Sequence, residues 1–480
     1  MDDAVVIGSG PNGMAAAVTL ARAGLSVRVL EKEDSIGGAA RTLPLTLSGF
    51  RHDVGAAIHP LALASPFFRA FELDRRIQLT VPDVSYAQPL AGAAGAAAYR
   101  SLGRTAAELG RDGSAWVRLF GPLVRHIDSV TDFTANQMLR LPRSPVTAAR
   151  FGLRALEQGS PLWNVRFREA RAPALLTGVI GHSIGRIPSL ASAAVGLVLA
   201  AHGHARGWPV PIGGSQAIID AMADDLVAHG GVIETGVEVT DLRELAGARI
   251  VIADTSARAL ARIGRSVLPR RYARRLDRLK YGDGVAKVDF ALSGPVPWAY
   301  EPARRSPTVH LGGTRWEIRA AEAAVASGVT AEAPYVLVSQ PTIVDPSRAP
   351  AGRHVLWAYI HVPHGSAHDP TADVMRMVES AAPGFRDLVL ASNAYTAHQL
   401  ERLDPNLVGG DISAGAITLP QLIARPRLSP HPWRTPVRGV YLGSSSTPPA
   451  SGVHGLSGFY AARLALRDIC DLATPDLRLR

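Results

Sequence analysis

The 480-residue sequence contains a single cysteine, Cys470, and only three lysines, Lys32, Lys280 and Lys287. One cysteine excludes an intramolecular disulfide and a metal site built from thiolates. Because the chain has 51 basic residues in all, the other 48 are arginines, and the formal net charge is +10. The arginines are dispersed, and no helix-turn-helix, zinc-finger or RNA-binding motif accompanies them. Nucleic acid is therefore not an expected partner.

The sequence also lacks a hydrophobic run long enough to span a membrane. The longest run, residues 190–201, falls short of the ~20 residues that a transmembrane helix needs. Asp2 and Asp3 stand where a signal peptide would carry positive charge. We therefore expect a cytoplasmic protein, and the arginine excess leaves open a peripheral contact with anionic lipid headgroups. The oligomeric state stays open.

The first 31 residues carry the pattern of a dinucleotide-binding βαβ unit. The apolar run 4–7 predicts a strand buried on both faces of a parallel sheet. It leads into the turn Gly-x-Gly-x-x-Gly at residues 8–13. Residues 15–21 then predict a helix, and residues 26–30 predict a second strand that ends before an acidic residue. The order of these elements is the context that this glycine motif requires.

Each residue of the turn has a physical reason to be there. Gly8 permits the tight turn, Gly10 lets the backbone approach a pyrophosphate, and Gly13 lets the helix pack closely on the strand. Pro11 and Asn12 complete the turn at the start of the helix. The free N–H groups and the positive dipole end of this helix would then face the phosphates.

An acidic residue and a second glycine pair follow the second strand. Glu31 can accept hydrogen bonds from the adenosine ribose hydroxyls, and Lys32 beside it is assigned to the same site. Gly37 and Gly38 would let a loop pass close over the phosphates. Arg41 would neutralise phosphate charge, or would be a solvated surface arginine. NAD enzymes do not require this glycine pair, whereas many FAD enzymes have it, so the pattern predicts non-covalent FAD.

Further motifs carry a family resemblance. They lie at residues 50–53, 207–209, 211–215, 308–313, 357–364 and 441–455. With the N-terminal turn, they make the chain resemble, essentially end to end, the phytoene desaturase-like FAD oxidoreductases of the amine oxidase superfamily. More narrowly, the chain resembles the branch named after pyridine nucleotide-disulfide oxidoreductase domain-containing protein 2.

The resemblance implies an α/β fold with two domains. A Rossmann-type, glutathione reductase-like FAD-binding domain would be discontinuous, and a mixed α+β substrate domain would complete the chain. The FAD-binding domain would comprise residues 1–75, 205–280 and 425–480. The substrate domain would comprise residues 76–204 and 281–424. A length of 480 residues also favours two domains over one core.

The resemblance also assigns C-terminal residues to FAD. Residues 437–442 predict a strand and residues 455–465 a helix, whose N-terminus would point at the flavin pyrimidine edge. Gly443 and Ser444 would lie near the ribityl–pyrophosphate portion. The residues expected near the isoalloxazine ring are Val453, His454, Gly455 and Leu456. Carotenoid desaturases have His-Pro-Gly after the threonine, whereas this chain has Pro-Pro-Ala after Thr447, which argues against a carotenoid substrate.

The middle of the chain supplies the expected adenine contact. Residues 232–233 and 237–242 predict adjacent strands, and residues 251–254 predict a strand that returns to the nucleotide site. By the resemblance, Val239 would contact the adenine. Val239 fits a plain core strand equally well.

The expected chemistry is hydride transfer from an organic substrate to the flavin N5, with oxygen or a quinone as electron acceptor. The sequence contains no second strand–GxGxxG–helix pattern, so a separate nicotinamide-binding domain is not expected. His454 and His59 are the candidates for a hydrogen-bonding or basic role, and His310 and His361 are candidates for lining the substrate cavity. Each also fits a structural role. No histidine, cysteine and carboxylate set has metal-ligand spacing, so no metal is expected.

Three functions remain open from the sequence. The first is dehydrogenation or desaturation of a small hydrophobic substrate, with bond isomerisation as a variant. The second is an amine or amino-acid-type oxidase on the same scaffold. The third is a catalytically silent, flavin-binding interaction protein. The apolar segment 172–201 predicts helices that either wall a hydrophobic tunnel or form ordinary core.

Overall fold

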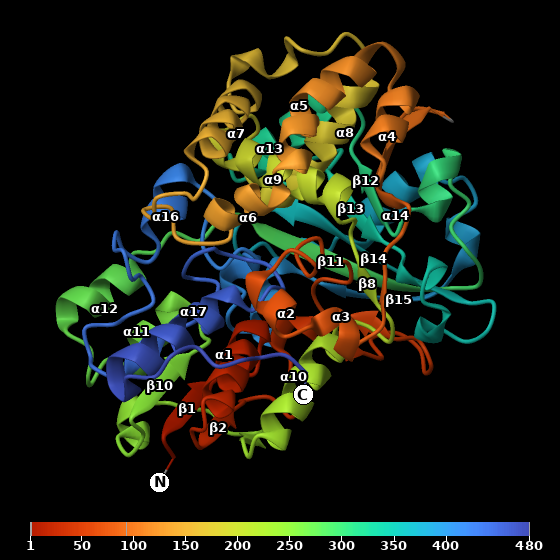
Figure 1. The fold of residues 1–480 in the computed structure, drawn as a ribbon. Coiled ribbons are helices and arrows are strands. Elements are labelled where there is room, and N and C mark those ends of the chain that lie inside the picture. Colours follow the sequence, from red (N-terminus) through yellow and green to blue (C-terminus); the bar gives the residue numbers. More distant parts are fainter. Residues whose placement is uncertain (1, 93, 480) are drawn as a thin grey trace.

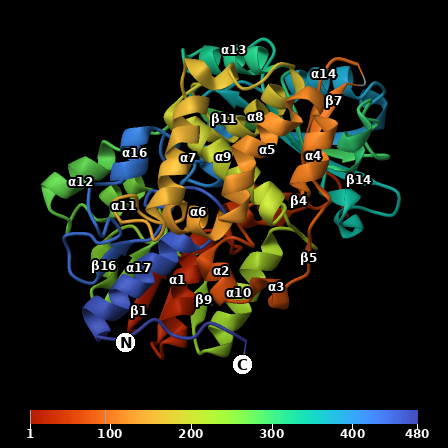
Figure 2. The ribbon, with the colours of Figure 1, turned by 45° about the horizontal axis from the view of Figure 1, so that its top comes forward.

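Two large β-sheets organise the fold, and each has helices on both faces. The computed structural model describes residues 2–92 and 94–479. Figures 1 and 2 show β1 (Ala4–Ile7) and α1 (Pro11–Arg22) at one end of the molecule and α7 (Pro145–Gln158) toward the other. The chain passes between the two parts several times.

The smaller sheet has five parallel strands in the order β16-β10-β1-β2-β9. Besides β1, its strands are β2 (Val27–Leu30), β9 (Val232–Glu234), β10 (Ile250–Ala253) and β16 (Val440–Leu442). They come from distant parts of the sequence, as expected for a discontinuous Rossmann-type domain. One face packs against α1, α10 (Gln216–Ala228) and α17 (Leu456–Ala465). The other face packs against α11 (Ala257–Ile263) and α12 (Arg270–Asp277).

The expectation of a strand over residues 237–242 is wrong. Residues 237–240 belong to no strand, and residues 242–245 form a 3-10 turn. Asp241 caps this turn by accepting a hydrogen bond from the Arg243 N–H, while the Glu244 carboxylate accepts one from the Asp241 N–H at 2.8 Å. This local capping box satisfies the backbone groups that a strand would have offered to a neighbour.

The larger sheet has seven strands in the order β15-β11-β14-β13-β12-β6-β7. β12 and β6 run parallel, and the other neighbours run antiparallel. The strands are β6 (Val84–Pro89), β7 (Gly95–Tyr99), β11 (Gly284–Leu292), β12 (Thr308–Leu311), β13 (Val336–Ser339), β14 (His354–Val362) and β15 (Val389–Tyr395). This mixed sheet and the parallel one confirm the expected fold class. The exact domain boundaries stay a prediction.

Helices cover the two faces of the larger sheet unequally. The face that carries Val285, Leu337 and Tyr359 packs against a helical layer, whereas the face that carries Ala286 and Val338 packs against α14 (Thr371–Ala381). The helical layer comprises α4 (Leu102–Glu108), α5 (Gly113–Arg125), α6 (Ile127–Thr134), α7, α8 (Arg171–Ile180), α9 (Leu190–Ala205) and α13 (Arg315–Val325).

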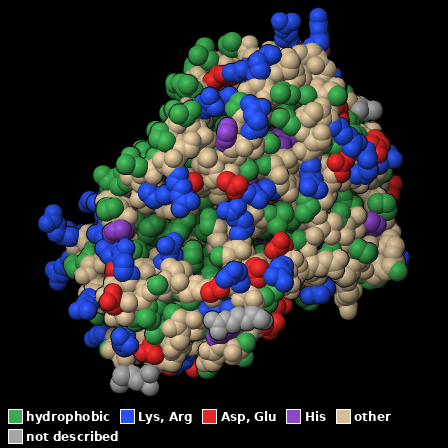
Figure 3. Space-filling model, in the orientation of Figure 1, with side chains coloured by type: hydrophobic (Ala, Val, Ile, Leu, Met, Phe, Trp, Pro, Cys, Tyr) green, Lys and Arg blue, Asp and Glu red, His purple; other side chains and the backbone are tan. Residues whose placement is uncertain are grey.

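Short elements connect these layers. The two-stranded sheets pair β3 (Thr42–Leu43) with β4 (His52–Asp53) and β5 (Leu79–Thr80) with β8 (Val210–Pro211). The remaining α-helices are α2 (Pro66–Ala70), α3 (Leu73–Arg76), α15 (Ala397–Leu403) and α16 (Leu419–Ala424). Among residues 2–92 and 94–479, no helix has both the length and the apolarity to cross a membrane. Figure 3 shows hydrophobic side chains along the upper left edge of the molecule, over α7.

Buried charges around Asp53, in β4, join the two parts of the fold. The Asp53 carboxylate accepts hydrogen bonds from Arg348 Nη2 at 2.5 Å and from Thr42 Oγ1 at 2.6 Å. The Lys287 ammonium, on β11, donates to the Asp53 carbonyl at 2.9 Å and to Asp289 at 2.6 Å. Burial alone would raise the pKa of the Asp53 carboxyl, but the charge of Arg348 and the hydrogen bonds hold that pKa below its usual value.

Arg348→Leu should lower the free energy of unfolding by about 3–5 kcal/mol, because the Asp53 carboxylate then stays buried without its cation. Urea unfolding at neutral pH measures this loss. The loss should shrink as the pH falls, since protonation neutralises the unpaired Asp53. Arg353→Leu changes an exposed arginine of the same segment and should alter the free energy by less than about 0.5 kcal/mol. Equal losses in the two variants would contradict the role of the Asp53 network.

Candidate cofactor and substrate cavity

One cavity of about 970 Å³ runs from the glycine turn before α1 to the larger sheet. Ligand pockets span roughly 300–1,000 Å³, so this one is near the upper end of that range. Residues 7–12 and 30–33 line one end. Side chains of α9, β11, β13 and β14 line the other end. The cavity therefore connects the predicted nucleotide site with the substrate domain.

The glycine turn has no room for side chains. A Cβ atom at Gly10 would lie 2.8 Å from Asp254 Oδ2, and one at Gly13 would lie 2.1 Å from the Gly8 carbonyl oxygen. Gly38 approaches the same turn, since its Cβ would stand 3.4 Å from the Gly10 Cα. These close contacts leave the backbone N–H groups at the start of α1 facing the cavity end, as an anion site requires.

Glu31 holds the turn as well as lining the cavity. Its Oε2 accepts hydrogen bonds from the Ser9 N–H at 2.9 Å and from Ser9 Oγ at 2.5 Å. Its Oε1 accepts one from the Glu33 N–H at 2.9 Å. The Gly37 N–H donates to Ser9 Oγ at 3.1 Å, so the second glycine pair is tied to the first turn. A carboxylate has about four lone-pair sites, and capacity for ribose hydroxyls remains.

Asp254 follows β10 and lines the cavity. From the sequence it was expected only as part of a strand, and not as a site residue. The Gly13 N–H donates to its Oδ2 at 2.7 Å, so the carboxyl group lies at the N-terminus of α1. Burial, with the charges of Asp404 and Glu31, raises the pKa of Asp254 to about 7. A group with this pKa is half neutral at physiological pH.

Arg41 is buried, at 5% exposure, and not a solvated surface arginine. Its Nε donates to the Gly38 carbonyl at 2.9 Å, and its Nη2 donates to the Leu403 carbonyl at 3.2 Å. It lines the cavity beside Asp404, whose pKa is raised by burial despite the nearby Arg41 charge. The guanidinium thus lies beside the predicted phosphate site and shapes the Gly38 turn.

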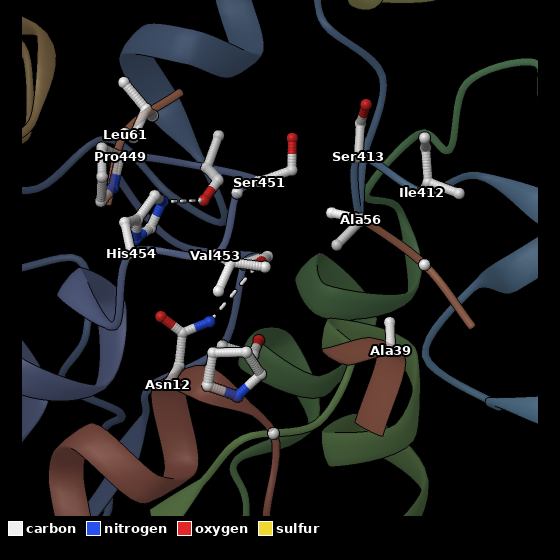
Figure 4. A pocket seen from close by; sticks show the side chains of 18 of the residues that line it. Asn12, Ala39, Ala56, Leu61, Ile412, Ser413, Pro449, Ser451, Val453 and His454 are labelled. Atoms are coloured by element: carbon white, nitrogen blue, oxygen red, sulfur yellow. Dashed lines mark hydrogen bonds between the residues drawn. The ribbon is translucent and has the colours of Figure 1, made fainter. Parts of the chain in front are cut away.

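Asn12 leaves a polar atom unsatisfied at the cavity. Its Nδ2 donates to Ser445 Oγ at 3.4 Å, as the dashed line in Figure 4 marks. Its Oδ1 is buried and has no hydrogen-bond partner among the described residues. Figure 4 also shows Val453 and Ala56 on the same cavity. An unpaired buried oxygen is costly and marks a place where a ligand donor fits.

The lining contains most of the residues expected at the cofactor. These are Gly8, Gly10, Pro11, Asn12, Glu31, Lys32, Gly38, Arg41, Val239, Ser444, Val453, His454 and Leu456. The lining leaves out Gly13, Gly37, Gly443 and Gly455. Two of them bond to lining residues through the backbone: the Gly13 N–H donates to Asp254 and the Gly37 N–H donates to Ser9. Val239 is 7% exposed and belongs to the buried cluster of the smaller sheet, so it combines core packing with a place on the cavity wall.

His454 has both ring nitrogens occupied by backbone groups. The Leu456 N–H donates to Nδ1 at 3.1 Å, so Nε2 carries the proton and donates to the Ala450 carbonyl at 3.1 Å. Burial lowers the pKa of His454 to about 4, which keeps the ring neutral. Figure 4 shows this ring beside Leu61 and Pro449. The geometry favours the structural alternative, in which His454 shapes the loop, over a basic role.

His59 keeps one nitrogen for the cavity. Its Nε2 lies 2.8 Å from Ser215 Oγ, and this hydroxyl donates its only proton to the Ala56 carbonyl. The ring must therefore donate from Nε2, which leaves Nδ1 with a free lone pair. Burial lowers the pKa of His59 to about 4, so the ring is a neutral acceptor.

His310 and His361 stand behind the cavity wall. His310 is fully buried and bonds His182 through the two Nε2 atoms at 2.9 Å. His361 Nδ1 lies 2.6 Å from Glu322 Oε1. The partner of His310, His182, does line the cavity, and it was not among the candidates from the sequence. It sits in the short 3-10 turn after α8, and no local motif identifies it.

Lys287, like Asp254 and His182, was not among the candidates from the sequence. It lines the cavity and is 4% exposed. The one available signal was its place in an otherwise apolar strand of a chain with three lysines. No cluster of three or more histidine, cysteine, aspartate or glutamate side chains suitable for a metal ion occurs within residues 2–92 and 94–479.

Comparisons with known proteins agree with this geometry. Residues 6–71 match the family described as an NAD(P)-binding Rossmann-like domain. The rat pyridine nucleotide-disulfide oxidoreductase domain-containing protein 2 is 28% identical, and the match covers 97% of this chain and 94% of the rat protein. The phytoene dehydrogenase of Streptomyces griseus is 26% identical over 88% of this chain and 82% of its own length.

A solved structure shares the fold. Putrescine oxidase bound to putrescine superposes with a TM-score of 0.57 at 18% identity, and the match covers 98% of each chain. At this identity the likeness concerns the fold alone. The two sequence relatives confirm the resemblance that the motifs carry: the chain is similar over most of its length to pyridine nucleotide-disulfide oxidoreductase domain-containing protein 2 and to a phytoene dehydrogenase.

Proposed function

We propose that this protein is an FAD-dependent enzyme that dehydrogenates or desaturates a small hydrophobic organic molecule. One observation carries the proposal: the glycine turn and the helix-covered face of the larger sheet line the same cavity. A cofactor anchored by its phosphates at the turn would reach the substrate domain through this space. The names of the rat and Streptomyces relatives support an oxidoreductase.

The residues at the turn fit FAD. Gly10 and Gly38 keep the turn compact, since a Cβ atom would lie 2.8 Å from Asp254 Oδ2 at Gly10 and 3.4 Å from the Gly10 Cα at Gly38, and the unpaired Asn12 Oδ1 adds a polar contact. Arg41 would face the pyrophosphate and Glu31 the ribose. FAD, when bound, supplies a flavin N5 that accepts a hydride from a substrate C–H bond. Oxygen or a quinone would be the final electron acceptor.

The chain itself positions the substrate and excludes water. Residues 190–199 of α9 present small apolar side chains to the cavity, which supports the expectation of a helix that walls a hydrophobic tunnel. Enclosure of this kind strengthens electrostatic interactions with the remaining polar groups. His59 offers a neutral acceptor at Nδ1, and the Lys287 ammonium on the cavity wall is paired with Asp289. His454 holds the loop that would lie against the flavin.

The visible spectrum of the purified protein tests the proposal. After reconstitution with FAD, flavin absorption bands should stay with the protein through gel filtration. Their absence would refute FAD binding. A bound flavin that neither substrates nor dithionite reduce would favour the silent interaction protein. Turnover of a small amine with release of peroxide would favour the amine oxidase alternative.

Gly10→Glu should abolish FAD binding, because its side chain would start 2.8 Å from Asp254 Oδ2 and place a negative charge in the phosphate site. Equilibrium dialysis with FAD measures the occupancy. Gly103→Glu introduces the same side chain at an exposed position of α4 and should retain full occupancy. Full occupancy in Gly10→Glu would show that the phosphates bind elsewhere.

FAD affinity should fall as the pH rises through about 7, because the Asp254 carboxyl then becomes an anion beside the pyrophosphate. One proton limits the slope to about tenfold per pH unit. Fluorescence titrations with FAD at pH 6, 7 and 8 measure the affinity and so give this slope. Asp254→Asn should give a flat profile, whereas Asp220→Asn, at an exposed acid of α10, should keep the wild-type slope. Equal slopes in both variants would exclude Asp254 as the titrating group.

We also propose a peripheral contact between α7 and an anionic lipid bilayer. Helix α7 turns Phe151 and Ala155 toward the cavity and Leu153 and Leu156 toward solvent. The exposed apolar side chains around it, which we call the α7 patch, are Leu139, Leu141, Val146, Leu153, Leu156, Leu162 and Val165 (Figure 3). Exposed arginines flank the patch at positions 143, 150 and 168. Apolar side chains bordered by arginine suit a bilayer with anionic headgroups.

Leu141→Asp combined with Val165→Asp should abolish sedimentation with phosphatidylglycerol-containing vesicles, because these two side chains are 87% and 78% exposed on the patch. Val232→Asp changes an exposed valine outside the patch and should leave sedimentation unchanged. Unaltered binding in the double variant would reject this contact. A change of molecular mass without vesicles would instead identify the patch as an interface between copies.

A further inference from the structure

A pair of neutral histidines forms one wall of the cavity in the substrate domain. The Nε2 atoms of His182 and His310 lie 2.9 Å apart, so a single proton is shared between them. Burial lowers the pKa of both rings, that of His182 to about 3; His361 lowers the pKa of His182 further, and His182 lowers that of His310. Neither ring carries a charge at physiological pH.

His182 is oriented by the residues around it. The Trp208 ring meets it edge-on with ring centroids 5.6 Å apart. His310 in turn contacts the rings of Tyr86 and Tyr335, with centroids 5.4 Å and 6.0 Å away. This aromatic surround fixes the imidazole with its Nε2 edge toward His310. Within the described residues, the hydrogen bond to His310 is the only one that the His182 ring makes, and the His182 side chain lines the cavity, so its Nδ1 is left for a ligand. The Nδ1 of His310 is also without a partner, but it is buried and does not line the cavity.

The charges along the cavity divide it into two ends. All the acidic side chains in the described lining lie in segments around the glycine turn, and they are Glu31, Glu33, Glu238, Asp254 and Asp404. The cations of the substrate-domain lining are already paired. Lys287 binds Asp289 at 2.6 Å, and Arg140 binds Asp132 at 2.5 Å. This end therefore offers no unpaired charge to a ligand.

The other groups at this end are apolar or neutral. Leu190, Val195 and Val198 of α9 and Leu337 of β13 supply apolar walls. Tyr359 lines the cavity, and burial raises the pKa of its hydroxyl, so this group stays protonated and neutral. A protonated amine would lose its hydration here without gaining a carboxylate partner. A neutral hydroxyl or carbonyl oxygen would lose less hydration free energy than an ammonium group and could form a hydrogen bond with the imidazole.

We propose that His182 is the recognition point for a neutral oxygen function, a hydroxyl or a carbonyl, on an otherwise apolar substrate. The inference deepens the proposed oxidoreductase function and rests on it. His182 binds and orients this oxygen, and His310 holds the imidazole in place. An apolar molecule with one oxygen function is thereby favoured over an alkylamine.

Calorimetric titration of the FAD-loaded protein with 1-octanol, 2-octanone and octylamine at neutral pH tests this assignment. The alcohol and the ketone should bind more tightly than octylamine. His182→Phe keeps a ring in the same space but removes both nitrogens, and it should weaken 1-octanol about fivefold, as expected for one neutral hydrogen bond. His182→Gln retains a polar side chain and should recover part of the affinity.

His202→Phe is the matched control. His202 also lines the cavity, but its Nε2 faces Thr131 Oγ1 at 3.4 Å and its Nδ1 is enclosed by protein. Unchanged 1-octanol affinity in His202→Phe is expected. Equal weakening in the two phenylalanine variants, or tighter binding of octylamine by the wild type, would overturn the proposal. The flavin spectrum of each sample is recorded in parallel, because loss of its bands counts against FAD binding and not against His182.

Discussion

The relative position of the two sheets depends on the buried charges around Asp53, and the cavity depends on that position. Arg348 neutralises the Asp53 carboxylate, while Lys287 reaches its carbonyl and so fixes an ammonium on the cavity wall. The Ser215 N–H donates to the same carboxylate at 2.9 Å, and the Ser215 hydroxyl orients His59. Because buried charges are costly unless fully paired, displacement of either sheet would break several of these contacts at once.

The two ends of the cavity differ in electrostatic character, and this difference separates their tasks. At the glycine turn, backbone N–H groups and Arg41 stand among several carboxyl groups, of which Asp254 is held near half-neutrality by burial. Such a site suits a phosphate-containing ligand whose sugar hydroxyls need acceptors. At the larger sheet, charges are paired and the free groups, His182 and Tyr359, are neutral. Under the proposed function, selectivity at this end would come from shape and single hydrogen bonds.

The nucleotide end could be predicted from the sequence because its determinants are local. The contacts among Gly8, Gly13 and Glu31 form within a single βαβ unit, so residue spacing alone identifies them. The failed strand over residues 237–242 shows the limit of such patterns: the Asp241 capping box satisfied the backbone locally, and alternation of side chains did not reveal it. Asp254 escaped notice because its role comes from a contact with Gly13 across the sheet.

The substrate end could not be predicted, because its residues meet only through long-range pairing. His310 pairs with Leu337, and Leu337 pairs with Tyr359, across three strands. Side chains alternate between the faces of a sheet, so this register decides that Tyr359 faces the helices. His182 then reaches the same wall from a turn after α8 and bonds His310. A shift of one residue in either pairing would turn His310 or Tyr359 toward the opposite face of the sheet. The residues that face the proposed substrate are therefore determined by the register of the sheet, whereas the glycine turn at the nucleotide end can be identified from residue spacing alone.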